Sequence, residues 1–291
     1  MFHIGDISYA RGSVSLWDQF FYQLSNMTAV MPWMVCDGNH ERDWPDSGSL
    51  FNGTDSGGEC GVAYSSRFNM PTNGEPGVTY WSIDYGSVHL TFMSTELAFG
   101  PSSPQYKWIV QDLLGVNRSQ TPFIVFNGHR PAYIDSTFAT GAGSDQVVAT
   151  ALRASLEPLW KAYQVDVAFW GHHHSAQRTC PVYNLECVDP SVGTIHIVTG
   201  ASGAGFTNSL EDPTPPFWQF VEVNQHAYSR VRVRGDSMKI EFVSSNDRSV
   251  IDSVTIQSKF PAQQQQQAAH KPSQRSRANR QAGKDGAIAE F

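Results

Sequence analysis

The chain has 291 residues and a formal net charge of −7, enough length for one large domain or two modest ones. Charged residues make up 16% of it and aromatic residues 12%, and residues 261–291 are basic whereas residues 1–260 carry the negative charge. An acidic body argues against a protein that coats nucleic acid, and no apolar run approaches the roughly 18–20 residues of a membrane-spanning helix.

Short apolar strands and amphipathic helices alternate up to about residue 170. The predicted strands cover 2–4, 32–36, 78–84, 87–93, 123–126 and 165–170, and the predicted helices cover 16–24, 104–114 and 145–163. Residues 43–77 are rich in Gly, Ser, Asp, Asn and Pro, which predicts a long functional loop.

Beyond residue 193 the predicted strands follow one another without helices. They cover 194–198, 218–223, 228–234, 238–243 and 250–256, so we expect a second, antiparallel sheet there. The sequence therefore predicts one α/β domain over 1–260, with a β-rich C-terminal part at about 193–258. A disordered Gln-rich and basic tail is expected over 261–291.

Four of the apolar strands end at polar residues. Asp6 follows the first strand, Asn39 and His40 follow the second, His129 follows the strand at 123–126, and a run of three histidines begins at His172. In layered α/β folds, ligands gather at the carboxyl ends of strands. We therefore expect these side chains to converge.

The polar residues at these strand ends have the chemistry of metal ligands. They are Asp6, Tyr9, Asn39, His40, His129, His172 and His174. Carboxylate, phenolate, amide and imidazole groups suit iron, zinc or manganese, and a pair of metals needs a bridging ligand such as Asp6. Each residue alone has a structural alternative: Asp6 and Asn39 could be helix N-caps, Tyr9 could pack in the core, and His129 could lie in a turn.

The cysteines and glycosylation sequons favour a secreted protein, although the first residues have no signal-peptide pattern. Cys180 and Cys187 bracket a short loop and are expected to form a disulfide, and Cys36 and Cys60 could form a second; the alternative is four buried thiols. The candidate glycosylation sites are Asn26, Asn52 and Asn117.

The strand-end motifs resemble, in their residues and in their order along the chain, the motifs of the metallophosphoesterase superfamily. The motifs are Gly5-Asp6-Ile7-Ser8-Tyr9, Gly38-Asn39-His40-Glu41, Gly128-His129-Arg130-Pro131 and Gly171-His172-His173-His174. The Tyr three residues after the Asp is typical of the purple acid phosphatase branch. The surrounding sequence, from about residue 2 to about residue 257, is similar to plant high-molecular-weight members, in particular those named as nucleotide pyrophosphatase/phosphodiesterases.

This resemblance implies a four-layer α/β/β/α sandwich of two mixed sheets and a dinuclear metal site. In such a site Asp6 would bridge the metals, Tyr9 and His174 would bind ferric iron (Fe3+), and His40 would assist the phosphate or the leaving oxygen. The divalent metal (Zn2+, Mn2+ or Fe2+) would be held by Asn39, His129 and His172. A ferric ion lowers the pKa of bound water enough to supply hydroxide.

The sequence departs from the family pattern at several places. The family's first motif, Asp-x-Gly, is absent, so we expect this sequence to be an N-terminally truncated piece that lacks the first strand and one ferric ligand. The family's substrate-binding histidines are replaced by Phe138 and Ala139, and its Tyr-Glu-Arg by Ala176-Gln177-Arg178. His173 occupies a variable position, and no ligand role is expected for it.

The resemblance implies hydrolysis of phosphate esters by a metal-bound hydroxide, as an acid phosphatase or as a nucleotide pyrophosphatase/phosphodiesterase. The expected partner is a small phosphate ester or nucleotide. The parent protein is expected to be extracellular or vacuolar. The resemblance does not fix its oligomeric state. The alternative is a catalytically inactive fragment without the first metal-ligand motif.

Overall fold

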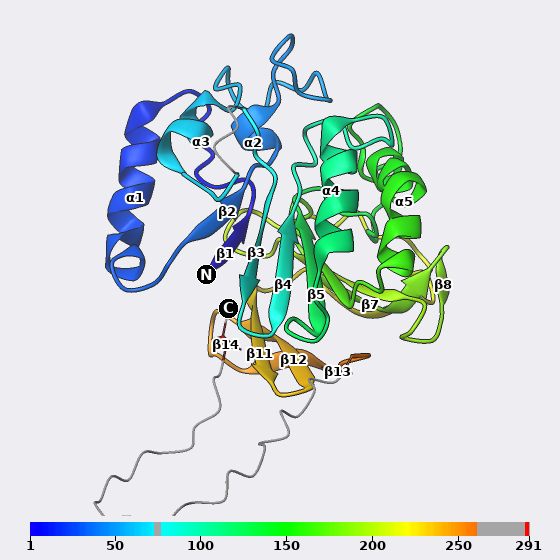
Figure 1. Ribbon diagram of the computed structural model, residues 1–291. Coiled ribbons are helices and arrows are strands. Elements are labelled where there is room, and N and C mark those ends of the chain that lie inside the picture. The colour runs from blue at the N-terminus through cyan, green and yellow to red at the C-terminus, as the bar shows by residue number, and fades with distance from the viewer. Residues whose placement is uncertain (73–76, 261–288, 291) are drawn as a thin grey trace, which may run out of the picture.

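A computed structural model describes residues 1–72, 77–260 and 289–290. Its elements form four layers, in the order helices, sheet, sheet, helices, as the resemblance implies (Figure 1). Nearly all of the expected tail over 261–291 lies outside the described residues. No helix among the described residues combines the length and the apolar character needed to cross a membrane.

The large sheet forms the centre of the molecule. Its strands run in the order β10-β7-β9-β6-β5-β4-β3, and the short β8 pairs with β7. The four central strands, β4, β5, β6 and β9, are parallel, whereas β3, β7 and β8 run antiparallel to their neighbours. The strands are β3 (Trp81–Tyr85), β4 (Val88–Phe92), β5 (Phe123–Gly128), β6 (Val167–Trp170), β7 (Ala176–Tyr183), β8 (Glu186–Cys187), β9 (Thr194–Thr199) and β10 (Trp218–Glu222).

Two helices cover one face of the large sheet. These are α4 (Pro104–Gly115) and α5 (Asp145–Ala162), which lie together in Figure 1. The hydroxyl of Ser103 accepts a hydrogen bond from the backbone of Tyr106 and so caps α4, and proline follows at the first helical position. Every residue of β5 and β6 is buried, because parallel strands at the centre of a sheet are covered on both faces.

The opposite face packs against a second β layer that consists of two separate sheets. One is the parallel pair β1 (Phe2–Ile4) and β2 (Met34–Cys36), and the other contains β11 (Ala227–Arg234), β12 (Ser237–Ser244), β13 (Val250–Gln257) and β14 (Ala289–Glu290). Leu90, Val125 and Ile240 belong to the buried cluster between the layers. Burial of these alternating apolar side chains contributes roughly 1.5–3 kcal/mol for each large one.

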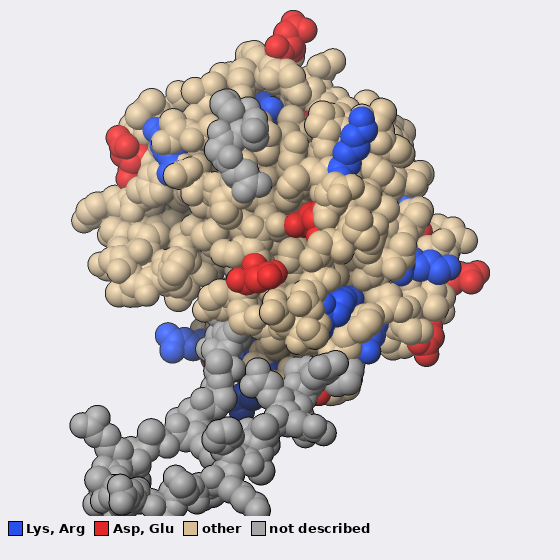
Figure 2. All heavy atoms as spheres, in the orientation of Figure 1, with Lys and Arg blue, Asp and Glu red and all other residues tan. Residues whose placement is uncertain are grey.

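The remaining helices lie beside β1 and β2 (Figure 1). They are α1 (Val14–Thr28), the short α2 (Asn39–Arg42) and α3 (Val62–Arg67). Trp17 of α1 is fully buried against Val35 of β2 and Tyr64 of α3. On the face shown in Figure 2, charged side chains are scattered over a surface that is mostly uncharged, in line with the low charge content of the sequence.

Three expectations need correction. Residue 193 does not divide two sheets, because β9 is parallel to β6 and β10 pairs with β7, so both belong to the large sheet. The strand β7, which mixes polar and apolar residues, was not expected from the sequence. The expected Cys36–Cys60 disulfide is wrong: both thiols are free, and Cys36 is completely buried at the end of β2.

The Cys180–Cys187 bond is present and joins β7 to β8, with 5.7 Å between the two Cα atoms. The three sequon asparagines are exposed. Glycosylation of Asn26, Asn52 and Asn117 stays a prediction.

Candidate metal centre

The strand ends that carry polar residues meet at one edge of the fold. Two glycines allow this approach: a Cβ on Gly5 would lie 2.5 Å from Nδ1 of His129, and one on Gly38 would lie 2.5 Å from Oδ1 of Asp6. Asp6 and His172 adopt left-handed backbone conformations, with φ of 53° and 65°. Such strained conformations in non-glycine residues concentrate at functional sites.

One half of the centre is formed by Asn39, His129 and His172. The side-chain oxygen of Asn39 lies 2.9 Å from Nε2 of His129 and 3.0 Å from Nδ1 of His172. Nδ1 of His129 is 2.8 Å from the carbonyl oxygen of Ile4, which only accepts, so this nitrogen donates and Nε2 is the atom that faces the centre. Asp6 Oδ2 approaches the same Nε2 to 3.1 Å.

The other half is formed by Tyr9 and His174. The Tyr9 hydroxyl lies 3.1 Å from Nε2 of His174 and 3.3 Å from Oδ2 of Asp6. Nδ1 of His174 lies 2.5 Å from the carbonyl oxygen of Gly205, which fixes the ring with Nε2 toward Tyr9. A metal-binding histidine commonly donates its other ring N–H to a backbone carbonyl, and this bond orients the ring. Asp6 lies between the two halves.

The donor set fits a cation. Ligand atoms of Asp6, His129 and His172 lie within 4.8 Å of one another. His172 Nδ1 lies 3.0 Å from the Asn39 oxygen, and its Nε2 lies 3.4 Å from both a carboxylate oxygen of Asp145 and Nη1 of Arg130. Carboxylate oxygen, amide oxygen and imidazole nitrogen gathered at one place are donors that suit iron, zinc or manganese.

The electrostatics of the cluster favour a positive charge at its centre. Burial lowers the pKa of His129, but the Asp6 carboxylate outweighs it and raises that pKa to about 9. Burial raises the pKa of Asp6, whereas the charge of His129 and its hydrogen bond bring it down well below the usual range. Burial, followed by the Arg130 charge, lowers the pKa of His172. A metal that binds here would replace a proton on His129.

His40 lies next to the centre rather than within it. Its backbone N–H donates to Oδ1 of Asp6 at 3.0 Å, and its Nδ1 lies 3.2 Å from the carbonyl oxygen of Asp55. The imidazole packs on the Tyr9 ring, with 4.2 Å between centroids. Burial lowers the pKa of His40. The ring therefore lies beside the Tyr9 half of the centre.

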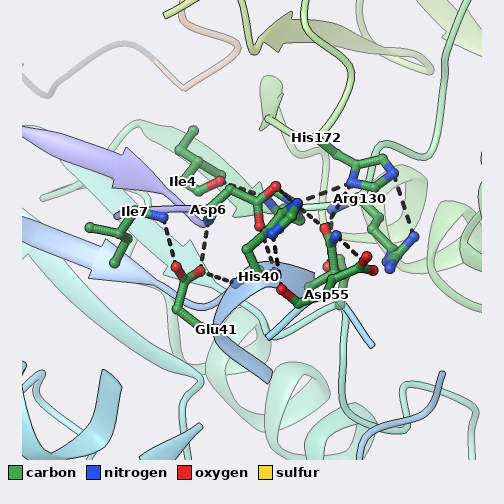
Figure 3. Close-up of polar contacts among 12 residues, drawn as sticks. Ile4, Asp6, Ile7, His40, Glu41, Asp55, Arg130 and His172 are labelled. Carbon is green, nitrogen blue, oxygen red and sulfur yellow. Dashed lines mark hydrogen bonds and ion pairs between the residues drawn. The ribbon is translucent and has the colours of Figure 1, made fainter. Parts of the chain in front are cut away.

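Glu41 holds the loop that carries Asp6, a role that the sequence did not predict. Its carboxylate accepts hydrogen bonds from the backbone of Asp6 and Ile7, both at 2.7 Å, and from Gly38 at 3.0 Å (Figure 3). The side chain is 1% exposed. The position of Glu41 directly after His40 in the motif was visible in the sequence. Its hydrogen bond to the backbone of Asp6, 35 residues away, was not.

Arg130 and Asp145 were also not predicted as part of the site. Arg130 is buried, pairs with Glu96 and Asp43 at 2.9 Å, and places Nη1 3.4 Å from Nε2 of His172 (Figure 3 shows Arg130 and His172). Asp145, the first residue of α5, contacts the same nitrogen at 3.4 Å. Arg130 directly follows His129 in its motif, which was an available signal, whereas nothing near Asp145 in the sequence marked it.

The structure brings together all seven polar residues expected at the strand ends. The side chain of His173 is buried, and its Nδ1 lies 2.7 Å from the hydroxyl of Ser175. Beside His172, a cavity of about 240 Å³ is lined by Phe138, Asp145, His172, His173, Thr207 and Ser209.

Comparisons with known proteins agree with this geometry. Residues 1–176 match the family model Calcineurin-like phosphoesterase, and residues 193–253 match Iron/zinc purple acid phosphatase-like protein C. The chain is 38% identical to Probable inactive purple acid phosphatase 27 of Arabidopsis thaliana, over 88% of this chain and 43% of that protein. It is 35% identical to a Nucleotide pyrophosphatase/phosphodiesterase of Hordeum vulgare, over 88% of this chain and 71% of that protein.

Among solved structures, purple acid phosphatase PPD1 from yellow lupin (Lupinus luteus) seeds superposes with a TM-score of 0.81 at 34% identity, over 88% of this chain and 46% of that one. The chain thus spans less than half the length of this lupin protein and of the Arabidopsis relative. The family uses a dinuclear metal centre, and its members are hydrolases. On these matches of family model, sequence and fold, the chain belongs to the purple acid phosphatases, within the calcineurin-like phosphoesterases.

Proposed function

We propose that this chain hydrolyses small phosphate esters at a dinuclear metal centre, as an acid phosphatase. The observation that carries the proposal is the convergence of ligand atoms from Asp6, His129 and His172 within 4.8 Å. A nucleotide pyrophosphatase or phosphodiesterase activity, which the name of the Hordeum vulgare relative suggests, is the finer form of the same proposal.

The residues divide into two ligand sets around Asp6, whose Oδ2 lies 3.1 Å from Nε2 of His129 and 3.3 Å from the Tyr9 hydroxyl. Asn39, His129 and His172 would hold a divalent ion (Zn2+, Mn2+ or Fe2+), because neutral imidazole and amide oxygen suit these ions. Tyr9 and His174 would hold Fe3+, because a phenolate is a hard, anionic donor that suits the higher charge. When bound, the two ions neutralise the phosphate charge and lower the pKa of a water nucleophile.

The chain's own residues would orient the substrate and handle the proton. His40 is held by its backbone hydrogen bond to Asp6, and its ring lies against Tyr9, from where we propose that it faces the leaving oxygen. A protonated imidazole there would donate to that oxygen as a general acid. Arg130 is committed to Glu96 and Asp43, so it would add positive potential without contacting the phosphate itself.

A second candidate is metal and phosphate binding without turnover. It is favoured by the names of the Arabidopsis relatives, which call those proteins probable inactive. Among the described residues, the candidate metal ligands in the Tyr9 half of the centre are Asp6, Tyr9 and His174. A weakly held metal in that half would leave a binding protein.

We also propose that the parent protein is secreted or vacuolar and glycosylated. The support is the disulfide between Cys180 and Cys187 together with three exposed sequons. Structural disulfides persist in oxidising compartments. Treatment of the protein from its natural source with a glycosidase would lower its apparent mass if Asn26, Asn52 or Asn117 carries glycan.

The deciding experiment measures the metal content per chain, the visible absorption spectrum and the hydrolysis of p-nitrophenyl phosphate. We expect two metals, iron among them, a purple band, and turnover in mildly acidic buffer. Asp6→Asn and His172→Ala should each remove most of the activity, by more than the roughly 10- to 100-fold that loss of an outer partner costs.

Asp18→Asn is the matched control for Asp6→Asn, because Asp18 is exposed on α1. Bound metal without turnover would support the second candidate. Normal turnover by His172→Ala would mean that the active site lies elsewhere.

A further inference from the structure

The long loop over residues 43–77 reaches the metal centre at Asp55. Its composition predicts a functional loop, yet it contains none of the candidate ligands. Oδ2 of Asp55 accepts a hydrogen bond from Nδ2 of Asn39 at 3.1 Å. The backbone carbonyl of Asp55 lies 3.2 Å from Nδ1 of His40, and Figure 3 shows the two residues side by side. One loop residue therefore contacts two consecutive residues of a strand-end motif, through two different groups.

The carboxylate of Asp55 decides which end of the Asn39 amide faces the centre. The oxygen and the NH2 group of an amide are similar in size, so only their hydrogen-bond partners distinguish the two orientations. A carboxylate only accepts hydrogen bonds, so it takes the NH2 end. Oδ1 of Asn39 then lies 2.9 Å from Nε2 of His129 and 3.0 Å from Nδ1 of His172. A reversed amide would turn N–H groups toward a cation instead of a ligand oxygen.

The backbone carbonyl of Asp55 decides the tautomer of His40. A carbonyl oxygen only accepts, so Nδ1 of His40 carries the hydrogen atom. Nε2 is then the ring nitrogen that remains for the proposed proton transfer. A substitution of the Asp55 side chain removes the carboxylate but keeps this carbonyl. The two contacts of Asp55 can therefore be separated by mutation.

The loop is held in place by bonds that do not involve the Asp55 side chain. Ser56, the next residue, is fully buried. Its backbone N–H and its hydroxyl both donate to the carbonyl of Asp43, at 3.2 and 3.0 Å. The carboxylate of Asp43 in turn pairs with Arg130 at 2.9 Å. A change of the Asp55 side chain should therefore leave the path of the loop intact.

We propose that Asp55 is a positioning residue, whose carboxylate fixes the Asn39 amide with its oxygen toward the metal centre. This inference rests on the proposed function, because it treats Asn39 as a ligand of the divalent ion. It adds that the affinity of this half of the centre depends on a loop residue that is not itself a ligand.

The test measures the affinity for Zn2+ by competition with a chelator. Asp55→Ala should bind Zn2+ about 10- to 100-fold more weakly than the wild type, the usual cost of losing the outer partner of a metal ligand. Asp55→Asn should restore most of the affinity, because its amide oxygen accepts from the same N–H of Asn39. Asp46→Asn, at an exposed position of the same loop, is the control. Wild-type affinity in Asp55→Ala would overturn the inference.

A double variant tests whether Asp55 acts through Asn39. Asn39→Ala alone should weaken Zn2+ binding, because a ligand is lost. Addition of Asp55→Ala to that variant should weaken binding by less than about twofold further, because the group that the carboxylate orients is already gone. A further loss as large as that caused by Asp55→Ala in the wild type would mean that the carboxylate supports the loop instead, and would overturn the positioning role.

Hydrolysis of p-nitrophenyl phosphate by the same samples separates this inference from the proposed function. Zn2+ affinity that depends on Asp55, in a protein without turnover, would support the inference and overturn the function. Normal turnover with an affinity independent of Asp55 would do the reverse. A wild type that does not bind Zn2+ would overturn both.

Discussion

Oδ1 of Asp145 lies 3.4 Å from Nε2 of His172, and Nδ1 of the same ring faces the side-chain oxygen of Asn39. The carboxylate is held in turn by the hydroxyl of Ser136. Asp145 is the first residue of α5, where the helix dipole favours a negative charge. The orientation of one candidate ligand is therefore fixed by a residue that makes no contact with the other ligands.

Removal of this carboxylate should weaken metal binding in the Asn39 half of the centre. We expect Asp145→Ala to lower the metal affinity about 10- to 100-fold, the usual cost of losing the outer partner of a ligating histidine. Asp145→Asn should retain part of the affinity, because its amide oxygen still accepts from Nε2. Competition with a chelator measures the affinity directly, and Asp18→Asn, at an exposed position of α1, is the control. Equal affinity in Asp145→Ala and the wild type would contradict the positioning role.

Tyr9 should be the source of visible colour. Its hydroxyl lies 3.1 Å from Nε2 of His174, at the half of the centre proposed for ferric iron. Tyr9→Phe removes the phenolate donor, so we expect the purple band to disappear while the ion held by Asn39, His129 and His172 remains bound. Absorption spectra and metal analysis of the same sample check both statements. A variant that stays purple would place the iron on other ligands.

His89 should make stability depend on pH. Burial alone would lower the pKa of His89, but hydrogen bonds to Asp112 and Asp84 outweigh it and raise the pKa. A folded-state pKa above the unfolded value of about 6.5 means that the charged ring stabilises the fold below that pH. This stabilisation is lost as the pH rises through the folded-state pKa.

The expected result is that the wild type exceeds His89→Gln in free energy of unfolding most strongly below about pH 6. The difference should shrink in alkaline buffer, as measured by urea unfolding across the pH range. In an Asp112→Asn background, the pH dependence of the difference should be smaller, because the main stabilising carboxylate is gone. A difference that grows with pH would contradict the assignment.

The cysteines should separate into one disulfide and two thiols of different reactivity. The bond between Cys180 and Cys187 closes a loop with a sequence separation of 7, and its removal should cost about 2–3 kcal/mol of unfolding free energy. In the folded protein, a maleimide should label Cys60, which is partly exposed, and should reach the fully buried Cys36 only after unfolding. Mass spectrometry of native and denatured samples distinguishes these sites. Two disulfides in the native sample would contradict the structure.

The candidate site could be predicted from the sequence to an unusual extent, because each part of it follows a short apolar strand. Asp6, Asn39, His129 and His172 come after β1, β2, β5 and β6, and parallel neighbouring strands place their carboxyl ends at the same edge. The pattern of strands therefore predicts that Asp6 lies near Asn39 and that His129 lies near His172. Packing of the two-stranded sheet against the large sheet brings the two pairs together. The glycines at positions 5 and 38 permit the close approach.

The sheet assignment after residue 193 could not be predicted in the same way. The strands β9 and β10 have the same apolar patterns as β11 and β12, yet they join a different sheet. Pairing depends on which edge is open when the layers pack, and a local pattern does not report this. The missed strand β7 is the element that links β9 and β10.

The sequence by itself determined most of the helices and strands and the polar residues that follow four of the strands, because these follow from local periodicity and from residue type. Only the tertiary structure decided that Cys36 is buried away from Cys60, that Asp145 faces His172, and that Phe138 lines the adjoining cavity. Those contacts join loops and helix ends whose paths are set by packing of the layers. Local propensity carries no information about which distant side chain such a loop will meet.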